Sequence, residues 1–399
     1  LSLRGSYGTS GNDKLIPRNT SSGYSSADEE ILYAYQGYYM TNPLYGQAGY
    51  KPKTMATPDL KWEKNEQYNV AVDFSFWNRF NGTIEFYTRN SKDLLYYKQL
   101  PLSAQIGDAN GYNTNLGNIR NRGIEITLGA TAIKTNDFQW NVDFNLSTLK
   151  NEVTYLPDGA YTYSSRGAGY KLDEGHSIFE FFMVKNAGVN PENGNMRYWI
   201  QDGNGGWKTT EKYSDVTVND YQWCGTAIPT VFGSLTNTFK YKDFDLSFMW
   251  YASFGSYMWD YQYLERTTVR DGVGVIQDLV EGKVWQKPGD NAEFPRWSAS
   301  NYGDTRRNSD FYLFKNNYWR LRNLTFGYTL PRQLTRKVGI SNARVYLSGD
   351  NLWTLGAAAK RHTEPETGMT GNNYNGNADT DNGVQGSRRV YMAGIQVTF

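Results

Sequence analysis

Few residues of this chain have the types and spacing that chemistry requires. Glu364 and Glu366, in "HTEPETG", are spaced like the paired carboxylates of a glycosidase. A loop does not fix the distance between two carboxylates, so we expect no catalytic role for this pair. The two histidines, His176 and His362, are far apart in the sequence, and no nucleophile and base accompany them. The sequence therefore predicts no enzyme.

Two acidic segments resemble calcium loops. They are "DGNGG" at 202–206, which is followed by Asp215, and "NADTDNG" at 377–383. Calcium sites use oxygen ligands two residues apart beside a glycine, but neither segment has the closing glutamate of a twelve-residue EF-hand loop. Flexible Asn/Asp/Gly turns explain both segments better. Calcium remains an alternative, and we assign no metal ligand and no cofactor.

Aromatic clusters give a stronger indication of ligand binding. The stretches "YWIQDGNGGW", "YQWCG" and "SYMWDYQY" place Tyr and Trp beside Asp, Asn and Gln. Flat aromatic faces can stack on sugar rings or on peptide side chains, while polar neighbours fix the orientation. The alternative is that these aromatics form small cores within long loops. If some bind a ligand, we expect them to be Tyr221, Trp223, Trp259 and Tyr261.

The elements that must position these loops are strands with strict two-residue alternation. Val70, Val72 and Phe74 in "NVAVDFSFW" share a face that Asp73 opposes. Such alternation indicates a strand with one apolar and one wet face. Two further stretches repeat the pattern, with Val142, Phe144, Leu246 and Phe248 on the apolar face and Asp143 and Asp245 on the other.

The strand lengths and connections favour a membrane barrel. A membrane-spanning strand needs about 9–11 residues, whereas globular strands usually have about 5–6. Short polar connections alternate with long loops, as at the two rims of an outer-membrane barrel. Ten strands are predicted, at about 1–8, 66–78, 82–97, 116–133, 138–153, 229–242, 244–255, 317–330, 343–354 and 389–399.

The composition agrees with an all-β chain. The 399 residues include 32 Tyr, 12 Trp, 19 Phe and 40 Gly, which suit strands and turns. The net charge of +1 is far from the strongly basic character of nucleic-acid-binding domains, so the sequence does not suggest a nucleic-acid partner. The prediction is a transmembrane antiparallel β-barrel with a wet lumen, long extracellular loops and short periplasmic turns. A soluble, aromatic-rich β-sandwich that binds glycans would explain the alternation, but not the strand length.

Several motifs occur in the order typical of one family. They are "TPDLKWEKNEQYNVAVDFSFW" (57–77), "NLGNIRNRGIEITL" (115–128), "WRLRNLTFGYTLP" (319–331), "RVYLSGDNLWTL" (344–355) and the final "GIQVTF". This series resembles SusC/RagA-type TonB-dependent outer-membrane transporters. The resemblance covers most of residues 1–399 but matches only the C-terminal part of a family member. It implies that these ten strands form roughly half of a 22-stranded barrel.

The resemblance also implies a function and partners. A family member imports oligosaccharides or peptides across the outer membrane of a Gram-negative bacterium, with a SusD-like surface lipoprotein as a lid and TonB as the energy source. We expect the plug domain and the TonB box to lie outside this chain. A passive porin-like or adhesin-like barrel remains the alternative.

Two expectations concern the edges of the sheet. In the family, an aromatic residue at the end of the last strand acts as the signal for barrel insertion, a role that Phe399 would have here. An unpaired strand edge is not tolerated in a membrane. We therefore expect Leu3 and Ile395 not to pair with each other, and both edges to pair with strands outside residues 1–399.

Overall fold

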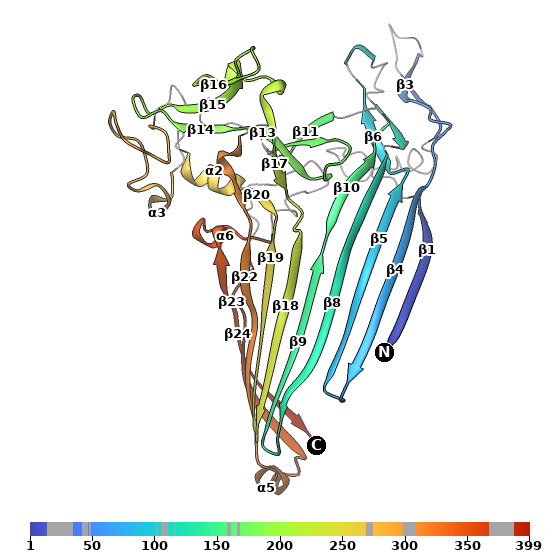
Figure 1. Ribbon diagram of the computed structural model, residues 1–399, viewed down its shortest axis with the longest axis vertical. Coiled ribbons are helices and arrows are strands. Elements are labelled where there is room, and N and C mark those ends of the chain that lie inside the picture. The colour runs from blue at the N-terminus through green and yellow to red at the C-terminus, as the bar shows by residue number, and fades with distance from the viewer. Residues whose placement is uncertain are drawn as a thin grey trace.

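The computed structural model describes residues 1–13, 35–41, 47, 49–100, 102–104, 111–115, 117–157, 161–165, 168–268, 274–297, 309–366 and 387–399. Its main feature is a single antiparallel sheet of long strands that forms a tall wall below a layer of loops (Figure 1). The strand order is β1-β4-β5-β8-β9-β18-β19-β22-β23-β24. These described strands form one sheet rather than two packed sheets, which argues against the sandwich alternative.

The ten predicted strands are all present. Their bounds are β1 Ser2–Asn12, β4 Glu63–Phe76, β5 Phe80–Lys92, β8 Asn118–Lys134, β9 Phe138–Thr148, β18 Val231–Tyr241, β19 Phe244–Phe254, β22 Tyr318–Thr329, β23 Asn342–Gly356 and β24 Val390–Thr398. The predicted strand 138–153 is interrupted, because β10 (Lys150–Tyr155) follows β9 as a separate strand that pairs with β8. At this break the hydroxyl of Thr148, rather than a backbone carbonyl, accepts the N–H of Ile124 at 2.8 Å.

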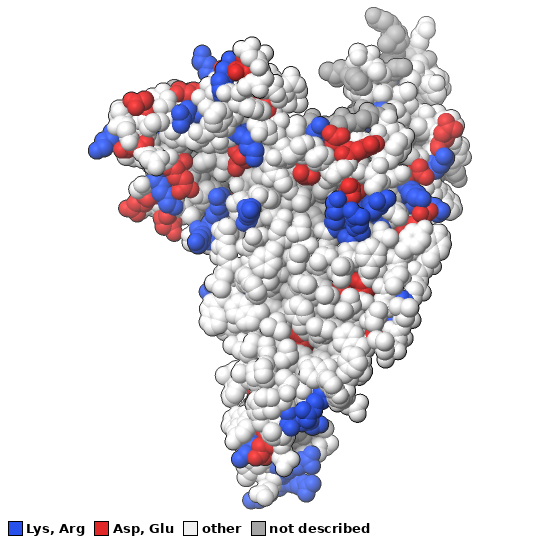
Figure 2. Space-filling view, in the orientation of Figure 1, with Lys and Arg blue, Asp and Glu red and all other residues white. Residues whose placement is uncertain are grey.

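The strand register gathers the predicted apolar residues on one face. Val70 lies opposite Phe86, and Val72 lies opposite Ile84. The same face continues through Phe144, opposite Leu128 and Leu235, to Phe248, opposite Leu324. Cross-strand neighbours on one face of a sheet pack against each other, so the apolar face is continuous. The wall shows few charged side chains between the loops and the lower end (Figure 2).

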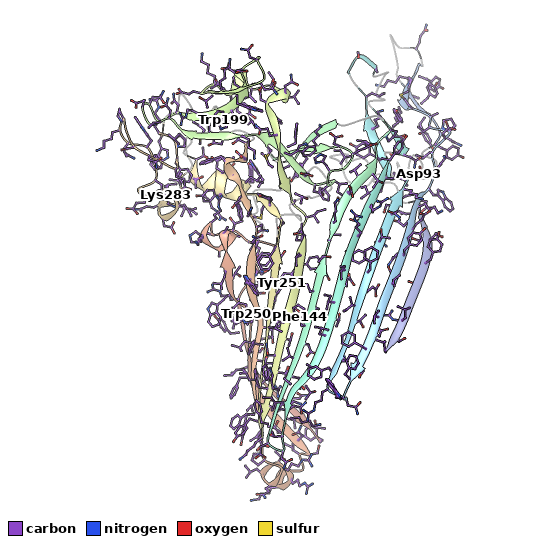
Figure 3. The ribbon with its side chains drawn as sticks, in the orientation of Figure 1. Asp93, Phe144, Trp199, Trp250, Tyr251 and Lys283 are labelled. Atoms are coloured by element: carbon purple, nitrogen blue, oxygen red, sulfur yellow. The ribbon has the colours of Figure 1, made fainter. Side chains whose placement is uncertain are left out.

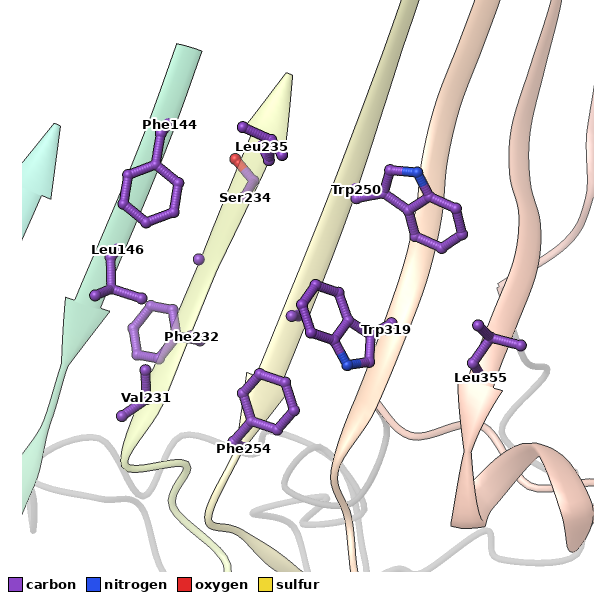
Figure 4. Close-up of a pocket in the computed structure, with 12 residues that line it drawn as sticks. Phe144, Leu146, Val231, Phe232, Ser234, Leu235, Trp250, Phe254, Trp319 and Leu355 are labelled. Carbon is purple, nitrogen blue, oxygen red and sulfur yellow. The ribbon is translucent and has the colours of Figure 1, made fainter. Parts of the chain in front are cut away.

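One part of this apolar face is hollowed into a groove of about 400 Å³. Gly233 and Ala252, which lie opposite each other on β18 and β19, leave the space. The indoles of Trp250 and Trp319 and the ring of Phe254 border it (Figure 4).

The opposite face carries the charged side chains, and two of its aspartates form ion pairs with arginines. Asp73 accepts hydrogen bonds from Arg4 at 2.5 Å and from Thr83 at 2.7 Å. Arg344 Nε donates to Asp245 at 2.8 Å across Gly327. A β-carbon at position 327 would collide with both side chains, so this glycine makes room for the ion pair. The predicted separation of Asp73, Asp143 and Asp245 from the apolar residues is confirmed by the register.

The connections also follow the prediction. At the lower end, turns of two or three residues join β4 to β5, β8 to β9 and β18 to β19, and the short helical turns α5 (Arg332–Thr335) and η6 (Arg336–Val338) join β22 to β23. The upper connections are long (Figure 1). No helix among the described residues has the length and apolar character needed to cross a bilayer.

The upper loops contain small sheets and helices of their own. The hairpins are β2 (Tyr38–Thr41) with β3 (Tyr50–Thr54), β6 (Leu95–Gln99) with β7 (Gly111–Asn115), and β20 (Tyr257–Trp259) with β21 (Leu313–Lys315). A second sheet has the order β11 (Tyr161–Ser165), β12 (Ala168–Leu172), β13 (Glu180–Val184) and β17 (Tyr221–Thr226), and a third has the order β14 (Asn186–Val189), β15 (Met196–Gln201) and β16 (Trp207–Thr210). The helices are α2 (Tyr261–Thr267), α3 (Gln277–Val280) and α6 (Ala357–Lys360). Buried apolar clusters pack the second and third sheets, the β20–β21 hairpin and the helices α2 and α3 together.

The sheet does not close within the described residues. β1 pairs with β4 alone, and β24 pairs with β23 alone. Leu3 lies opposite Val72, and Ile395 lies opposite Val345, so the two edges do not pair with each other, as predicted.

Candidate ligand-binding site

Two exposed indoles on one hairpin form the centre of the candidate site. Along β15, Met196, Tyr198 and Ile200 are buried, so Trp199 points to the other side and is 39% exposed. Trp207 on β16 is 44% exposed and lies opposite Gln201. Because residues two apart on a strand share a face, Trp199 and Trp207 are diagonal neighbours on the exposed face of this hairpin. Figure 3 shows Trp199 among the upper loops.

A pocket of about 440 Å³ lies beside these indoles. Lys185, Asn186 and Gln222 complete its lining. Lys185 Nζ lies 3.3 Å from Asp310, whose other carboxylate oxygen accepts the backbone N–H of Asn186 at 2.6 Å. The side-chain nitrogen of Asn186 is buried and has no hydrogen-bond partner among the described residues. The pocket therefore offers two flat apolar faces, two amides and one cation that is already paired.

Neighbouring side chains stabilise the charged form of Lys185. Partial burial lowers the pKa of this ammonium group, but Cys224 and Asp310 outweigh burial and raise it. An ammonium group that is already paired contributes a hydrogen-bond donor without an uncompensated charge.

The hairpin is held rigid by two carboxylates, the half-buried Glu211 and the buried Asp220. Glu211 accepts hydrogen bonds from the amides of Asn190 at 2.5 Å, Asn193 at 3.1 Å and Asn195 at 2.7 Å. Asp220, which is 3% exposed, accepts the backbone N–H of Gln201 at 2.6 Å. A site held in place before the ligand arrives loses less free energy to ordering on binding. The geometry suits stacking against a ring, with amides orienting polar groups.

The predicted residues Tyr221 and Trp223 lie on the other face of the strand that carries Gln222. Trp223 packs against Phe182 with 5.1 Å between the ring centroids, and the imidazole of His176 stacks on its indole at 3.7 Å. His176 also contacts Glu180 at 3.1 Å. One face of the Trp223 indole is therefore covered by the imidazole of His176, and a ligand could contact only the rest of the ring.

Trp259 and Tyr261 lie deeper in the loops. The indole N–H of Trp259 donates to the backbone oxygen of Ser309 at 3.1 Å, and its ring packs against two buried clusters. Tyr261, half-buried at the start of α2, lies 6.2 Å from Trp259 between ring centroids. The contacts of Trp259 are those of a core residue, which was the alternative for the aromatic set. None of the four predicted residues lines the pocket beside Trp199 and Trp207.

The two glutamates of the "HTEPETG" segment bind arginines. Arg320, which is 2% exposed, contacts Glu364 at 2.5 Å and Glu366 at 3.1 Å, and Arg322 contacts Glu366 at 2.6 Å. His362 contacts Asp278 at 3.2 Å, far from His176 in the sequence. These contacts tie the segment to the charged face of β22. They give the two glutamates a structural role.

The first calcium-like segment is a hairpin turn. Asp202 accepts the backbone N–H groups of Asn204 at 2.7 Å and Gly206 at 2.9 Å, and Asp215 accepts the hydroxyl of Thr210 at 2.6 Å. Across the part of the chain that the structure describes, no group of three His, Cys, Asp or Glu side chains could hold a metal ion. The second segment, 377–383, lies outside the described residues.

The wall of long alternating strands, with charges on one face and apolar residues on the other, is that of an outer-membrane barrel. The family description "TonB dependent receptor-like, beta-barrel" matches residues 1–257. The chain belongs to this family. TonB-dependent receptors form barrels in the outer membrane of Gram-negative bacteria, and the SusC/RagA resemblance found in the motifs agrees with the relatives below.

Curated relatives and solved structures support the assignment. TonB-dependent receptor P3 of Formosa agariphila is 28% identical over 99% of this chain and 39% of its own length. SusC of Bacteroides thetaiotaomicron is 28% identical over 86% of this chain and 34% of its own length. The RagAB peptide transporter structure has the same fold, with a TM-score of 0.75 and 23% identity over 100% of this chain and 40% of the matched chain. The chain thus spans about two fifths of the relatives it matches.

Trp199 and Trp207 were not among the four predicted residues, although both belong to the stretch "YWIQDGNGGW". For Trp199, the sequence contains a local signal of exposure. Met196, Tyr198 and Ile200 alternate with Trp199, so the apolar phase of this strand already turns the indole away from the core.

Proposed function

We propose that this chain forms part of the barrel wall of a SusC-type importer that takes up oligosaccharides or peptides across the outer membrane. The observation that carries the proposal is the two-faced wall, whose ion-paired face would line the lumen and whose apolar face would contact lipid. In this proposal both sheet edges pair with further strands of a 22-stranded barrel, and a plug domain belongs to the complete protein.

Partners follow from the same proposal. A SusD-like surface lipoprotein would cover the loops, and TonB would supply energy through the plug. SusC and the RagAB peptide transporter are the relatives that suggest such a system. Because one relative is named for peptide transport, the substrate class remains a choice between oligosaccharide and peptide.

The pocket beside Trp199 and Trp207 is our candidate for first contact with the substrate. The exposed indoles would stack on rings, and Gln222 and Asn186 would bind polar groups. Binding of labelled oligosaccharides and peptides to the purified complete protein tests this role. We expect Trp199→Ala with Trp207→Ala to weaken binding of one substrate class by about tenfold or more, as for loss of an aromatic anchor. The matched control is Trp297→Ala, because Trp297 is 50% exposed but does not line the pocket.

A passive porin-like barrel is the second candidate, since the wall alone is compatible with either function. Uptake in cells that lack TonB separates the two candidates. An importer of the proposed kind stops taking up substrate without TonB, whereas a passive barrel continues.

A further inference from the structure

The lower rim of the wall carries an excess of positive charge. Two of its turns, between β4 and β5 and between β18 and β19, contain Arg79 and Lys242. The fourth connection, between β22 and β23, adds Arg332, Arg336 and Lys337. We call these five residues the basic rim. The acidic residues of the four lower connections are Asp137 and Asp243, so these connections have an excess of three positive charges in a chain whose net charge is +1.

The side chains of the basic rim are available to bind a partner. All five side chains are exposed. Among the described residues, none of the five forms an ion pair, whereas arginines elsewhere on the wall, such as Arg4, Arg320 and Arg344, are paired with carboxylates. Basic side chains are prominent at the lower end of the molecule (Figure 2). An exposed excess of one sign of charge attracts a partner of the opposite sign.

Aromatic residues place the rim at the depth of lipid headgroups. Trp77 is 84% exposed and Tyr241 is 54% exposed, and both lie within two residues of a rim cation. Trp and Tyr are enriched where a membrane meets water. The ammonium group of Lys242 lies 5.6 Å from the ring of Tyr241. The cations thus begin where the apolar face ends.

The connection between β22 and β23 has the composition of an interfacial segment. Leu334 is 56% exposed, although it lies among the exposed Arg332, Arg336 and Lys337. An exposed leucine flanked by cations suits a position between acyl chains and phosphate groups. In water alone, the exposed leucine side chain would have no apolar partner and the cations would have no phosphate groups to bind.

We infer that the basic rim binds the phosphate groups of anionic phospholipids in the inner leaflet of the outer membrane. This inference goes beyond the proposed function, since it uses only the family's place in the outer membrane and not the substrate. The contacts are charge-assisted hydrogen bonds from guanidinium and ammonium groups to phosphate oxygens. They would fix the height of the barrel in the membrane.

Lipid selectivity of the complete protein tests the inference. The protein is placed in nanodiscs of equal parts phosphatidylglycerol and phosphatidylethanolamine, and the lipids that stay bound are counted by native mass spectrometry. The test variant combines Arg332→Gln, Arg336→Gln and Lys337→Gln. We expect its enrichment of phosphatidylglycerol to fall by about tenfold or more, since each surface cation near an anionic membrane contributes favourably. Salt should reduce the wild-type enrichment in the same direction.

Two matched variants separate charge from structure. Arg332→Lys with Arg336→Lys retains the charge and should keep the enrichment. A control that replaces the exposed Lys287, Lys315 and Lys360 of the loop side by glutamine loses the same charge and should also keep it. The inference is overturned if the test variant remains enriched or if the loop-side control loses as much. It is also overturned if the rim variant loses only binding to isolated peptidoglycan, which would make that polymer the partner.

Discussion

The indole Nε1 of Trp140 donates a hydrogen bond to Oδ1 of Asn237, 3.0 Å away. Asn237 lies on the apolar face, opposite Val142 and Phe248, and is 8% exposed. An amide in this position needs a partner within the protein, because lipid offers none. Trp140 supplies that partner while its ring stacks on Phe239 at 5.6 Å.

Replacing Trp140 by Phe should therefore destabilise the barrel by about 1–3 kcal/mol, the cost of an unsatisfied buried polar group. The temperature at which the folded barrel loses its altered gel mobility measures the change. Asn237→Leu combined with Trp140→Phe should recover part of the loss. Equal destabilisation in the single and the double variant would show that the hydrogen bond is not the cause.

Arg320 should hold the "HTEPETG" segment against the wall. Its guanidinium also donates to Thr354 and Ser387, each at 3.0 Å, and Arg320→Met removes the buried cation that faces the Glu364 carboxylate. Breaking a buried ion pair on one side costs about 3–5 kcal/mol. We expect faster hydrogen exchange in residues 357–366 with the barrel intact. Arg322→Met, at a more exposed arginine, should have a smaller effect.

The two faces of β9 should meet different surroundings. Asp143 and Phe144 are neighbours in the sequence but point to opposite sides of the sheet. In the complete barrel, Asp143→Cys should react with a charged, water-soluble thiol reagent, and Phe144→Cys should react only with an apolar one. Cys224 is buried and serves as the background. A reversed pattern would contradict the proposed orientation of the wall.

Protonation of Glu211 at low pH should weaken its hydrogen bonds and make the candidate site more mobile. Burial raises the pKa of this carboxyl, but the amides of Asn195, Asn190 and Asn193 outweigh burial and hold it below 4.5. Its stabilisation is thus fully present above the ordinary carboxyl pKa and is lost as the pH falls through the lowered value. We expect hydrogen exchange in residues 186–211 to rise at such pH. Glu211→Gln should raise exchange already at neutral pH and remove this pH dependence.

Phe399 should matter for assembly. It follows the last residue of β24 and is 90% exposed. If a terminal aromatic is the insertion signal, Phe399→Ser lowers the amount of barrel in the outer membrane, and Phe399→Trp restores it. Quantifying heat-modifiable protein in outer-membrane fractions checks this. Normal insertion with poor uptake would contradict the signal role.

The sequence by itself determined the wall. Val70, Asp73, Phe144 and Asp245 alternate with a period of two, and that phase is local, so the strands, their faces and their turns could be predicted without knowledge of distant contacts. The break at Leu149 was missed because Thr148 replaces a ladder bond with a side-chain bond to Ile124 on another strand.

Only the tertiary structure decided which loop aromatics are open to a ligand. His176 covers Trp223 from 47 positions away, and Ser309 holds Trp259 from 50 positions away. Trp199 and Trp207 stay exposed because Tyr198 and Ile200 fill the core on the other face of their hairpin. Exposure in a loop depends on contacts between segments far apart in the sequence, and residue type alone does not fix such contacts.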